Sequence, residues 1–191
     1  MMAVPLTQQV HLKLKTIINK GDIVVDATVG NGHDTLFLSE CVGEQGIVYG
    51  FDIQKQAIES TRLKLEQSDL SHRVRLFETS HEKMKNVIKL EHKGQITAIM
   101  FNLGYLPGGD KAIKTETPST ILALQQSLEL LKPSGILSVV AYPGHPGGDD
   151  ESLSVRNWFD SHGESSFELT IPDSEHNNVP QWFWIDKSNL K

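Results

Sequence analysis

The segment VVDATVGNGHDTLFL, residues 24–38, joins an apolar run to an amphipathic pattern through a turn that contains two glycines. A short apolar run that ends in an acidic residue is typical of a buried parallel strand, and apolar residues after Gly32 recur at helical spacing. Glycine at positions 30 and 32 lets the backbone pass close to a ligand, because side chains there would occupy the ligand's space. The segment therefore predicts a strand, a ligand-binding turn and a helix, in that order.

The alternation of strand and helix continues along the whole chain. We expect an opening helix between Pro5 and Gly21, and a helix at Thr117 that begins with a threonine cap followed by Pro118. The near-continuous apolar strands predict a mostly parallel sheet that is covered on both faces, which makes the fold α/β, Rossmann-like and seven-stranded with a C-terminal antiparallel hairpin. The predicted strands are 23–27, 46–53, 74–79, 96–103, 135–142, 166–171 and 180–186, and the further helices are 33–42, 54–67, 82–90, 117–131 and 152–159.

Size and composition limit the classes of protein to consider. The 191 residues fit one domain over residues 1–191, with the opening helix in residues 1–20 packed on it. No apolar run approaches the roughly 20 residues of a membrane span, and the start lacks the pattern of a secretory signal, so we expect no membrane partner. The net charge of −6 argues against a protein that coats nucleic acid indiscriminately.

Cysteine and histidine usage adds two expectations. Cys41 is the only cysteine, which excludes an internal disulfide and suits a reducing cytoplasm. The eight histidines are scattered without a His-x-x-x-His pattern, so we predict no metal site.

Asp52 ends the second predicted strand, about 20 residues beyond the glycine turn, where a carboxylate can accept both hydroxyl hydrogens of a ribose. A dinucleotide and S-adenosylmethionine are the two cofactors that fit this arrangement. The nicotinamide fingerprint needs a third glycine where Thr35 stands. A dehydrogenase is therefore disfavoured, and S-adenosylmethionine remains as the other cofactor that fits.

Asp26, four residues before Gly30, resembles motif I of the class I S-adenosylmethionine-dependent methyltransferases. This resemblance implies that Asp26 and the turn glycines line the methionine part of the cofactor and that Asp52 holds the ribose. Ile53 and the pair Ser80-His81 would flank the adenine, although families in this class often carry an acidic residue at the latter point. The implied cofactor contacts are Asp26, Thr28, Gly30, Asn31, Gly32, His33, Asp34, Asp52, Ile53, Ser80, His81 and Asn102.

Four segments together are similar to the family of rRNA methylases. They are DATVGNGHDTLFL (26–38), FNLGYLPGGDK (101–111), AYPGHPGGDDE (141–151) and NNVPQWFWIDK (177–187), and the likeness covers nearly the whole chain. Members of that family are associated with methylating 5-aminomethyluridine, or its 2-thio form, at the wobble position of bacterial tRNA. The resemblance thus implies an N-methyltransferase whose substrate is the anticodon region of tRNA.

The predicted end of the fourth strand, Asn102-Leu103-Gly104-Tyr105, resembles the Asn-Pro-Pro-Tyr segment of many amine methyltransferases, although both prolines are absent. There, the asparagine accepts hydrogen bonds from the amine and the aromatic ring packs on the substrate. Asn102 and Tyr105 are thus candidate catalytic residues, the alternative for Asn102 being a turn cap.

An alkyl amine must lose a proton before its lone pair can attack, so a group that titrates near neutrality is expected nearby. We predict that His145 relays this proton and that Asp149 orients it. In the glycine-rich loop after Tyr105, Asp110 would attract the aminomethyl group and Lys111 would meet a tRNA phosphate. Solvated turns and connectors are the alternative interpretation of these four residues.

Other functions remain open at this point. An rRNA or small-molecule amine methyltransferase on the same fold fits the same motifs, as does a non-catalytic protein that binds the cofactor or RNA. Trp182 and Trp184 alternate with Phe183 and predict core or interface packing, with base stacking as the alternative. Exposed aromatic residues in the terminal strands and the lack of an RNA-binding appendage lead us to expect a homodimer.

Overall fold

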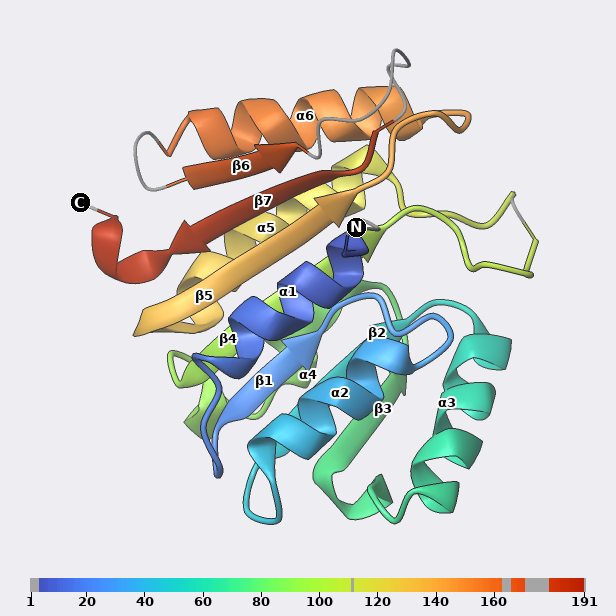
Figure 1. Cartoon of the computed structure of the whole chain (residues 1–191), viewed down its shortest axis with the longest axis vertical. Helices are drawn as coiled ribbons and strands as arrows, with labels where there is room; N and C mark the ends of the chain where they lie inside the picture. The colour runs from blue at the N-terminus through green and yellow to red at the C-terminus, as the bar shows by residue number, and fades with distance from the viewer. Residues whose placement is uncertain (1–3, 111, 163–165, 171–178, 191) are drawn as a thin grey trace.

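The computed structural model describes residues 4–110, 112–162, 166–170 and 179–190. Within them, seven strands form one sheet in the order β3-β2-β1-β4-β5-β7-β6 (Figure 1). The strands are β1 Ile23–Asp26, β2 Ile47–Asp52, β3 Val74–Glu78, β4 Ile96–Leu103, β5 Leu131–Ala141, β6 Ser166–Thr170 and β7 Gln181–Asp186. The first five run parallel, and β7 pairs antiparallel with both β5 and β6, which confirms the predicted fold.

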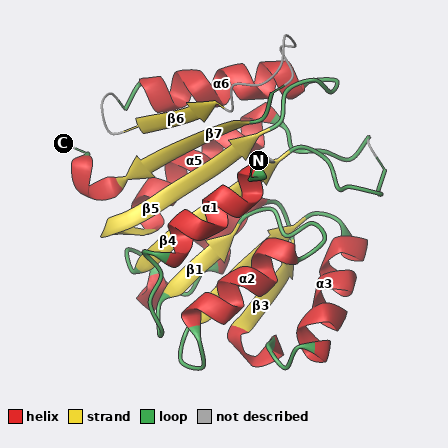
Figure 2. Cartoon of the chain, in the orientation of Figure 1, coloured by secondary structure: helices red, strands yellow, loops and turns green. Residues whose placement is uncertain are grey.

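Helices cover both faces of this sheet (Figure 2). They are α1 Leu6–Lys15, α2 His33–Val42, α3 Lys55–Gln67, α4 Met84–Val87, α5 Thr117–Leu130 and α6 Gly148–Asp160. Successive strand residues point to opposite faces, so Val24 packs in the cluster under α1 and α2, whereas Val25 packs in the cluster under α4, α5 and α6. No helix in the described part of the chain is long and apolar enough to cross a membrane.

Strand β7 is more buried than predicted. Trp182 is 7% exposed and donates its indole N–H to Ser138 Oγ at 2.9 Å, and Phe183 is 1% exposed on the opposite face. Core packing is confirmed for both residues. The expectation that aromatic residues of the terminal strands are exposed is therefore wrong for Trp182 and Phe183.

Two predicted helices have wrong bounds, and one predicted cap is wrong. The 82–90 helix is reduced to α4 flanked by short 3₁₀ turns, because Ile88 adopts extended angles. α5 begins at Thr117 as predicted, but the predicted threonine cap is wrong, because Glu116 is the N-cap and makes no side-chain bond. α6 begins at Gly148 rather than residue 152, directly after Gly147 with its φ of 82°, and its acidic first turn suits a helix N-terminus.

Candidate functional site

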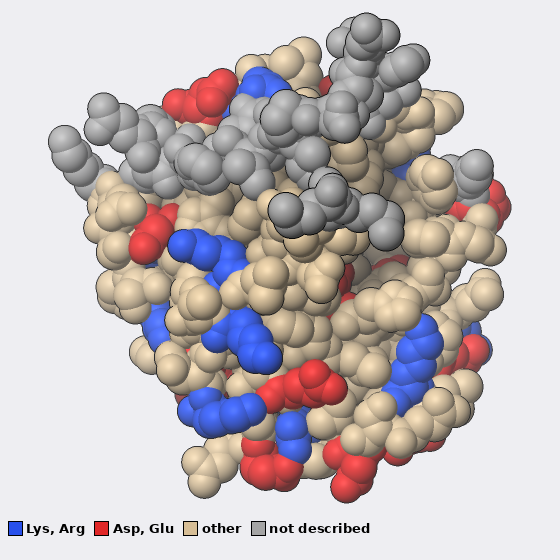
Figure 3. Space-filling model, viewed as in Figure 1, with Lys and Arg blue, Asp and Glu red and all other residues tan. Residues whose placement is uncertain are grey.

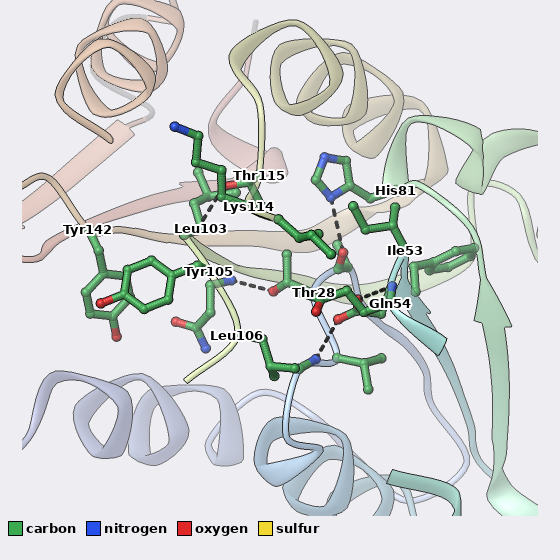
Figure 4. Close-up of a pocket in the computed structure, with 18 of the residues that line it drawn as sticks. Thr28, Ile53, Gln54, His81, Leu103, Tyr105, Leu106, Lys114, Thr115 and Tyr142 are labelled. Carbon is green, nitrogen blue, oxygen red and sulfur yellow. Dashed lines mark hydrogen bonds between the residues drawn. The ribbon is translucent and has the colours of Figure 1, made fainter. Parts of the chain in front are cut away.

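A cavity of about 1220 Å³ opens at the carboxyl ends of the parallel strands, where loops after β1 to β5 converge with α1. His81 and Ile53 lie at one end of it, and Tyr105 and Tyr142 lie at the other (Figure 4). The predicted site residues that line it are Thr28, Gly30, Asn31, His33, Asp34, Asp52, Ile53, Ser80, His81, Asn102, Tyr105 and His145. Asp26, Gly32, Asp110 and Asp149 are not among its lining residues, and Lys111 lies outside the described residues.

Asp52 fixes the glycine turn to the end of β2. Its Oδ2 accepts the backbone N–H of Gly30 at 2.8 Å, and its Oδ1 accepts that of Gln54 at 2.8 Å (Figure 4). Burial raises the pKa of this carboxyl, against these bonds that lower it. Since each carboxylate oxygen has two lone pairs, Asp52 retains acceptor capacity on both oxygens.

Asp26 lies under the turn and holds it from below. It is 1% exposed and accepts hydrogen bonds from Thr35 Oγ1 at 2.5 Å and from the Thr28 backbone at 3.2 Å. Burial, followed by the nearby negative charge of Asp34, raises the pKa of Asp26 to about 7. The residue in the third fingerprint position, Thr35, is thus a partner of Asp26.

The two turn glycines serve different purposes. Gly30 lines the cavity, and a Cβ there would lie 3.6 Å from Leu106, which itself lines the cavity. Gly32 has a φ of 78°, and a Cβ there would lie 2.5 Å from Thr61 Oγ1 on α3. Gly30 leaves its part of the cavity wall without a side chain, whereas Gly32 permits the close packing of α3 against the turn.

His81 follows β3 at the Ile53 end of the cavity. Its Nδ1 lies 3.2 Å from the Ala27 carbonyl, and its ring meets Phe101 edge-on at 5.5 Å. Burial lowers the pKa of His81 to about 4, so the ring is neutral at pH 7 and Nδ1 is the nitrogen that donates to the carbonyl. His81 Nε2 is then a buried acceptor, and it has no hydrogen-bond partner among the described residues.

Asn102 stands near the end of β4, beside the glycine turn. Its backbone N–H donates to Thr28 Oγ1 at 2.7 Å, and its side-chain Nδ2 donates to Asp34 Oδ2. Its Oδ1 is buried and has no hydrogen-bond partner in the described part of the chain.

Asp34 also meets a residue that the sequence analysis missed. Asp34 Oδ1 lies 2.5 Å from His11 Nε2, and the His11 ring stacks on Phe37 at 3.9 Å. His11 comes from α1 and lines the cavity. No local spacing connects positions 11 and 34, so the pattern of residues gave no signal for this contact.

The candidate proton-relay residues are only partly brought together. His145 lies 5.5 Å from Tyr105 between ring centroids, and its buried Nε2 has no hydrogen-bond partner among the described residues. Asp149 accepts the Gly144 backbone N–H at 3.2 Å, so its described bond holds the loop backbone. Asp110 is exposed and accepts the Ala112 backbone N–H at 2.8 Å.

A buried carboxylate ties the loop after β4 to α6. Glu151 is 3% exposed and accepts hydroxyl hydrogens from Thr115 at 2.6 Å and from Thr120 at 2.7 Å. Thr115 Oγ1 in turn accepts the Gly104 backbone N–H at 2.9 Å. Sequence reasoning missed this cluster, and it missed Lys114 and Tyr142, which also line the cavity.

The charged side chains show no metal-binding arrangement among the described residues: no group of three or more His, Cys, Asp or Glu residues there is placed to hold an ion. The cavity instead combines apolar walls with a few placed donors and acceptors, as is typical of sites for organic ligands.

Comparison with known proteins identifies a family and several proteins that this chain is similar to. The model of a family described as "Putative rRNA methylase" matches residues 48–185. A chloroplastic tRNA (mnm(5)s(2)U34)-methyltransferase of Arabidopsis thaliana is 44% identical over 163 residues, which are 81% of this chain and 58% of that protein. The chain therefore spans little more than half the length of this curated relative.

Two solved structures share the whole fold. A "putative rRNA-methylase" from Clostridium thermocellum is 38% identical with a TM-score of 0.88, and the match covers 97% of this chain and 99% of that one. A "putative methyltransferase" from Streptococcus mutans, solved in complex with SAH, is 31% identical with a TM-score of 0.81 over 97% and 99% of the two chains.

Proposed function

Since the chain belongs to the rRNA methylase family, we propose that it is an S-adenosylmethionine-dependent N-methyltransferase of tRNA. The proposed reaction converts 5-aminomethyl-(2-thio)uridine at the wobble position to 5-methylaminomethyl-(2-thio)uridine. The observation that carries this proposal is the pairing, in one cavity, of nucleoside-binding groups with the acceptor Oδ1 of Asn102. The name of the Arabidopsis relative and the SAH bound to the Streptococcus mutans protein support it.

The residues at the His81 end fit the nucleoside part of the cofactor. Asp52 retains lone pairs for the ribose hydroxyls, and Ile53, which is 53% exposed, offers an apolar surface to the adenine. The buried Nε2 of His81 is an acceptor that suits an amino group such as that of adenine. His81 thus supplies a neutral acceptor at the position where many class I methyltransferase families have an acidic residue.

S-adenosylmethionine, when bound, supplies a methyl group on a positively charged sulfur. Asn102 Oδ1 would accept one N–H of the aminomethyl group, which orients the nitrogen lone pair toward the methyl carbon. His145 Nε2 would take the proton that the ammonium form must lose, since Nδ1 lies toward the Pro146 carbonyl at 3.4 Å. The Tyr105 ring, edge-on to His145, would pack on the uracil.

The finer assignments belong to the same proposal. We place the substrate contact in the anticodon region of tRNA, with Asp110 attracting the amine and Lys111 meeting a phosphate. We also propose a homodimer, because a second copy would supply basic surface that one small chain with a net charge of −6 lacks. Cys41, a half-buried free thiol, suits the reducing cytoplasm that we propose as its location.

The test is methylation of purified tRNA from cells that leave the 5-aminomethyl group unmodified, read by mass spectrometry of nucleosides. We expect the 5-methylaminomethyl nucleoside to appear with S-adenosylmethionine and the wild-type protein. Asn102→Ala should lower the rate about 100-fold, in the range for loss of one positioned hydrogen-bond partner. Asn86→Ala, at an exposed position on α4, is the matched control and should keep the wild-type rate.

Parallel reactions with rRNA and with free alkyl amines decide between substrates. Methyl transfer to either of these but not to tRNA would overturn the tRNA assignment. Binding of SAH without transfer to any acceptor would instead indicate a non-catalytic protein.

A further inference from the structure

The side-chain amide of an asparagine can take two orientations, and only one of them offers its oxygen to a given neighbour. At Asn102 the orientation is decided by chemistry, because Nδ2 faces the carboxylate of Asp34, which can only accept hydrogen bonds. The oxygen is consequently the atom left without a partner among the described residues. An alcohol or amide in place of Asp34 would not enforce this choice, since each can both donate and accept.

Asp34 is itself held from a second direction. Its Oδ1 receives His11 Nε2 at 2.5 Å, while Oδ2 receives Asn102, so both carboxylate oxygens have a donor. His11 lies nearly parallel to the Phe37 ring, with 4° between the planes, which fixes the direction of its ring nitrogen. The three residues come from α1, α2 and β4, and all three line the cavity.

We propose that Asp34, held by His11, is the positioning residue that turns the oxygen of Asn102 toward the acceptor amine. This inference rests on the proposed function, because it names the group that prepares Asn102 for an N–H of the substrate. Asp34 acts through Asn102 and does not touch the reacting atoms. His11 acts one step further away, by holding the Asp34 carboxylate in the orientation in which it accepts the hydrogen bond from Asn102 Nδ2.

A purely structural role for Asp34 leads to different expectations. An acidic residue in the first turn of a helix stabilises that helix, so Asp34 could serve α2 alone. Its loss would then lower stability and leave the turnover of the folded protein unchanged. A positioning role instead lowers kcat while the affinity for SAH and the melting temperature stay close to wild type.

The first experiment compares Asp34→Asn with Glu40→Gln, which removes one negative charge from an exposed position on the same helix. With tRNA bearing the aminomethyl group, we expect Asp34→Asn to lower kcat about 10- to 100-fold, as for a displaced catalytic group, with SAH affinity within about 3-fold. Glu40→Gln should match wild type. An unchanged kcat in Asp34→Asn would overturn the inference.

A reciprocal exchange separates positioning from loss of charge. In Asn102→Asp with Asp34→Asn, the new amide at position 34 donates to the new carboxylate at position 102, which still has an oxygen for the amine. We expect this double variant to recover about 10-fold over Asn102→Asp alone, where two carboxylates face each other. No recovery would count against the orientation argument.

His11 is tested by two substitutions that divide its contacts. His11→Phe keeps a ring that can stack on Phe37 but removes the donor to Asp34, and we expect it to lower kcat about 3- to 10-fold. His11→Gln keeps a donor and loses the ring, and it should retain more activity than His11→Phe. The reverse order would show that ring packing, rather than donation to Asp34, is what matters.

A readout without any substrate makes the failure of this inference distinct from failure of the proposed function. In protein labelled with ¹⁵N-asparagine, the Asn102 side-chain amide, assigned by its absence in Asn102→Asp, should exchange slowly with solvent. We expect Asp34→Asn to accelerate that exchange at least about 10-fold, and Glu40→Gln to leave it unchanged. If the exchange rate of the Asn102 amide is the same in wild type and Asp34→Asn, the inference is overturned. If the rate changes in Asp34→Asn but the wild-type protein is inactive on tRNA, only the proposed function is overturned.

Discussion

At the scale of single residues, Asp26 makes folding stability depend on pH. Its pKa rises from an ordinary 3.8 to about 7, first through burial and then through Asp34. The stability that protonated Asp26 contributes is full below about pH 4 and is lost as the pH rises through 7. We therefore expect the free energy of unfolding of Asp26→Asn to rise relative to that of wild type between pH 4 and pH 8. This change with pH is independent of any constant difference in stability between the two proteins.

Urea unfolding of both proteins across this range measures the difference. His81 titrates in the opposite sense, because its pKa is lowered to about 4 and its contribution is lost as the pH falls from 6.5 toward 4. That contribution is common to the two proteins and cancels in the comparison. Stability curves that stay parallel from pH 4 to pH 8 would contradict the raised pKa of Asp26.

A second residue-scale prediction concerns Gly32. Alanine there would be strained by a φ of 78° and would also place its Cβ 2.5 Å from Thr61 Oγ1. Gly94 is a matched control, since its φ of 75° is similar and no atom lies within 4 Å of its virtual Cβ. We expect Gly32→Ala to lower the free energy of unfolding about 1–3 kcal/mol more than Gly94→Ala. Equal losses, measured by urea unfolding, would mean that the turn yields to the methyl group.

At the scale of elements, the Glu151 cluster joins the loop after β4 to the first turn of α6. Glu151→Ala would leave the hydroxyls of Thr115 and Thr120 without their buried acceptor, which costs about 1–3 kcal/mol of stability. Because Thr115 also accepts the Gly104 N–H, we expect faster hydrogen exchange at Gly104. Asp150→Ala, at an exposed position on the same turn, is the control. Loosening of Gly104 in the control but not in Glu151→Ala would disprove the link.

The sequence predicts elements well where a local pattern controls them. Helix α2 has the predicted bounds, and the strands ending at Asp52 and Leu103 end at or within one residue of prediction, since apolar runs and turn residues act over short distances. The predicted start of α6 is wrong because Gly147 and Gly148 are poor helix formers by local propensity, yet Gly147 is the N-cap and Gly148 the first residue of the helix. Met84 and Ile88 are both buried, and their spacing of four residues predicts a helix. The predicted 82–90 helix is wrong because Ile88 has an extended backbone, which ends α4 at Val87.

In the candidate site too, local sequence patterns predict some residues, whereas residues placed by contacts between distant segments are missed. Twelve predicted residues line the cavity because strand ends and the glycine turn are local signals. His11, Thr115 and Glu151 join it through contacts across 23 to 36 positions, which no periodicity encodes. Sequence reasoning thus identified residues that line the cavity and missed the contacts that hold the polar groups of this cavity in position.

At the scale of the whole molecule, charge limits how the proposed tRNA substrate can be recognised. The net charge is −6, and on the face seen in Figure 3 the lysines and arginines are interspersed with acidic side chains. Several basic residues are engaged within the protein, such as Arg73 with Glu44 and Lys85 with Glu129. This distribution argues that the proposed tRNA contact uses few phosphates and depends on the modified base in the cavity.

Salt dependence tests this argument. Each neutralised phosphate adds about 0.7 to the slope of log affinity against log salt for single strands, so about three contacts predict a slope near −2. Raising monovalent salt from about 50 to 200 mM should then weaken tRNA binding about 10- to 30-fold, far less than the loss for a protein that makes 6–10 contacts. Affinity for SAH should change little, because it does not depend on phosphate contacts.

Substitution of a cavity lysine refines the test. Lys114 lines the cavity, so Lys114→Gln should reduce the slope by about 0.7 if this lysine contacts a phosphate, whereas Lys55→Gln, on exposed α3 surface, should not. A slope near −6 in the wild type would require a larger basic surface than one copy of the chain offers on the face of Figure 3. Light scattering at the same salt concentrations would then show whether a second copy supplies this surface. If the basic surface is shared by a dimer, the salt dependence of tRNA binding must become less steep when the dimer dissociates.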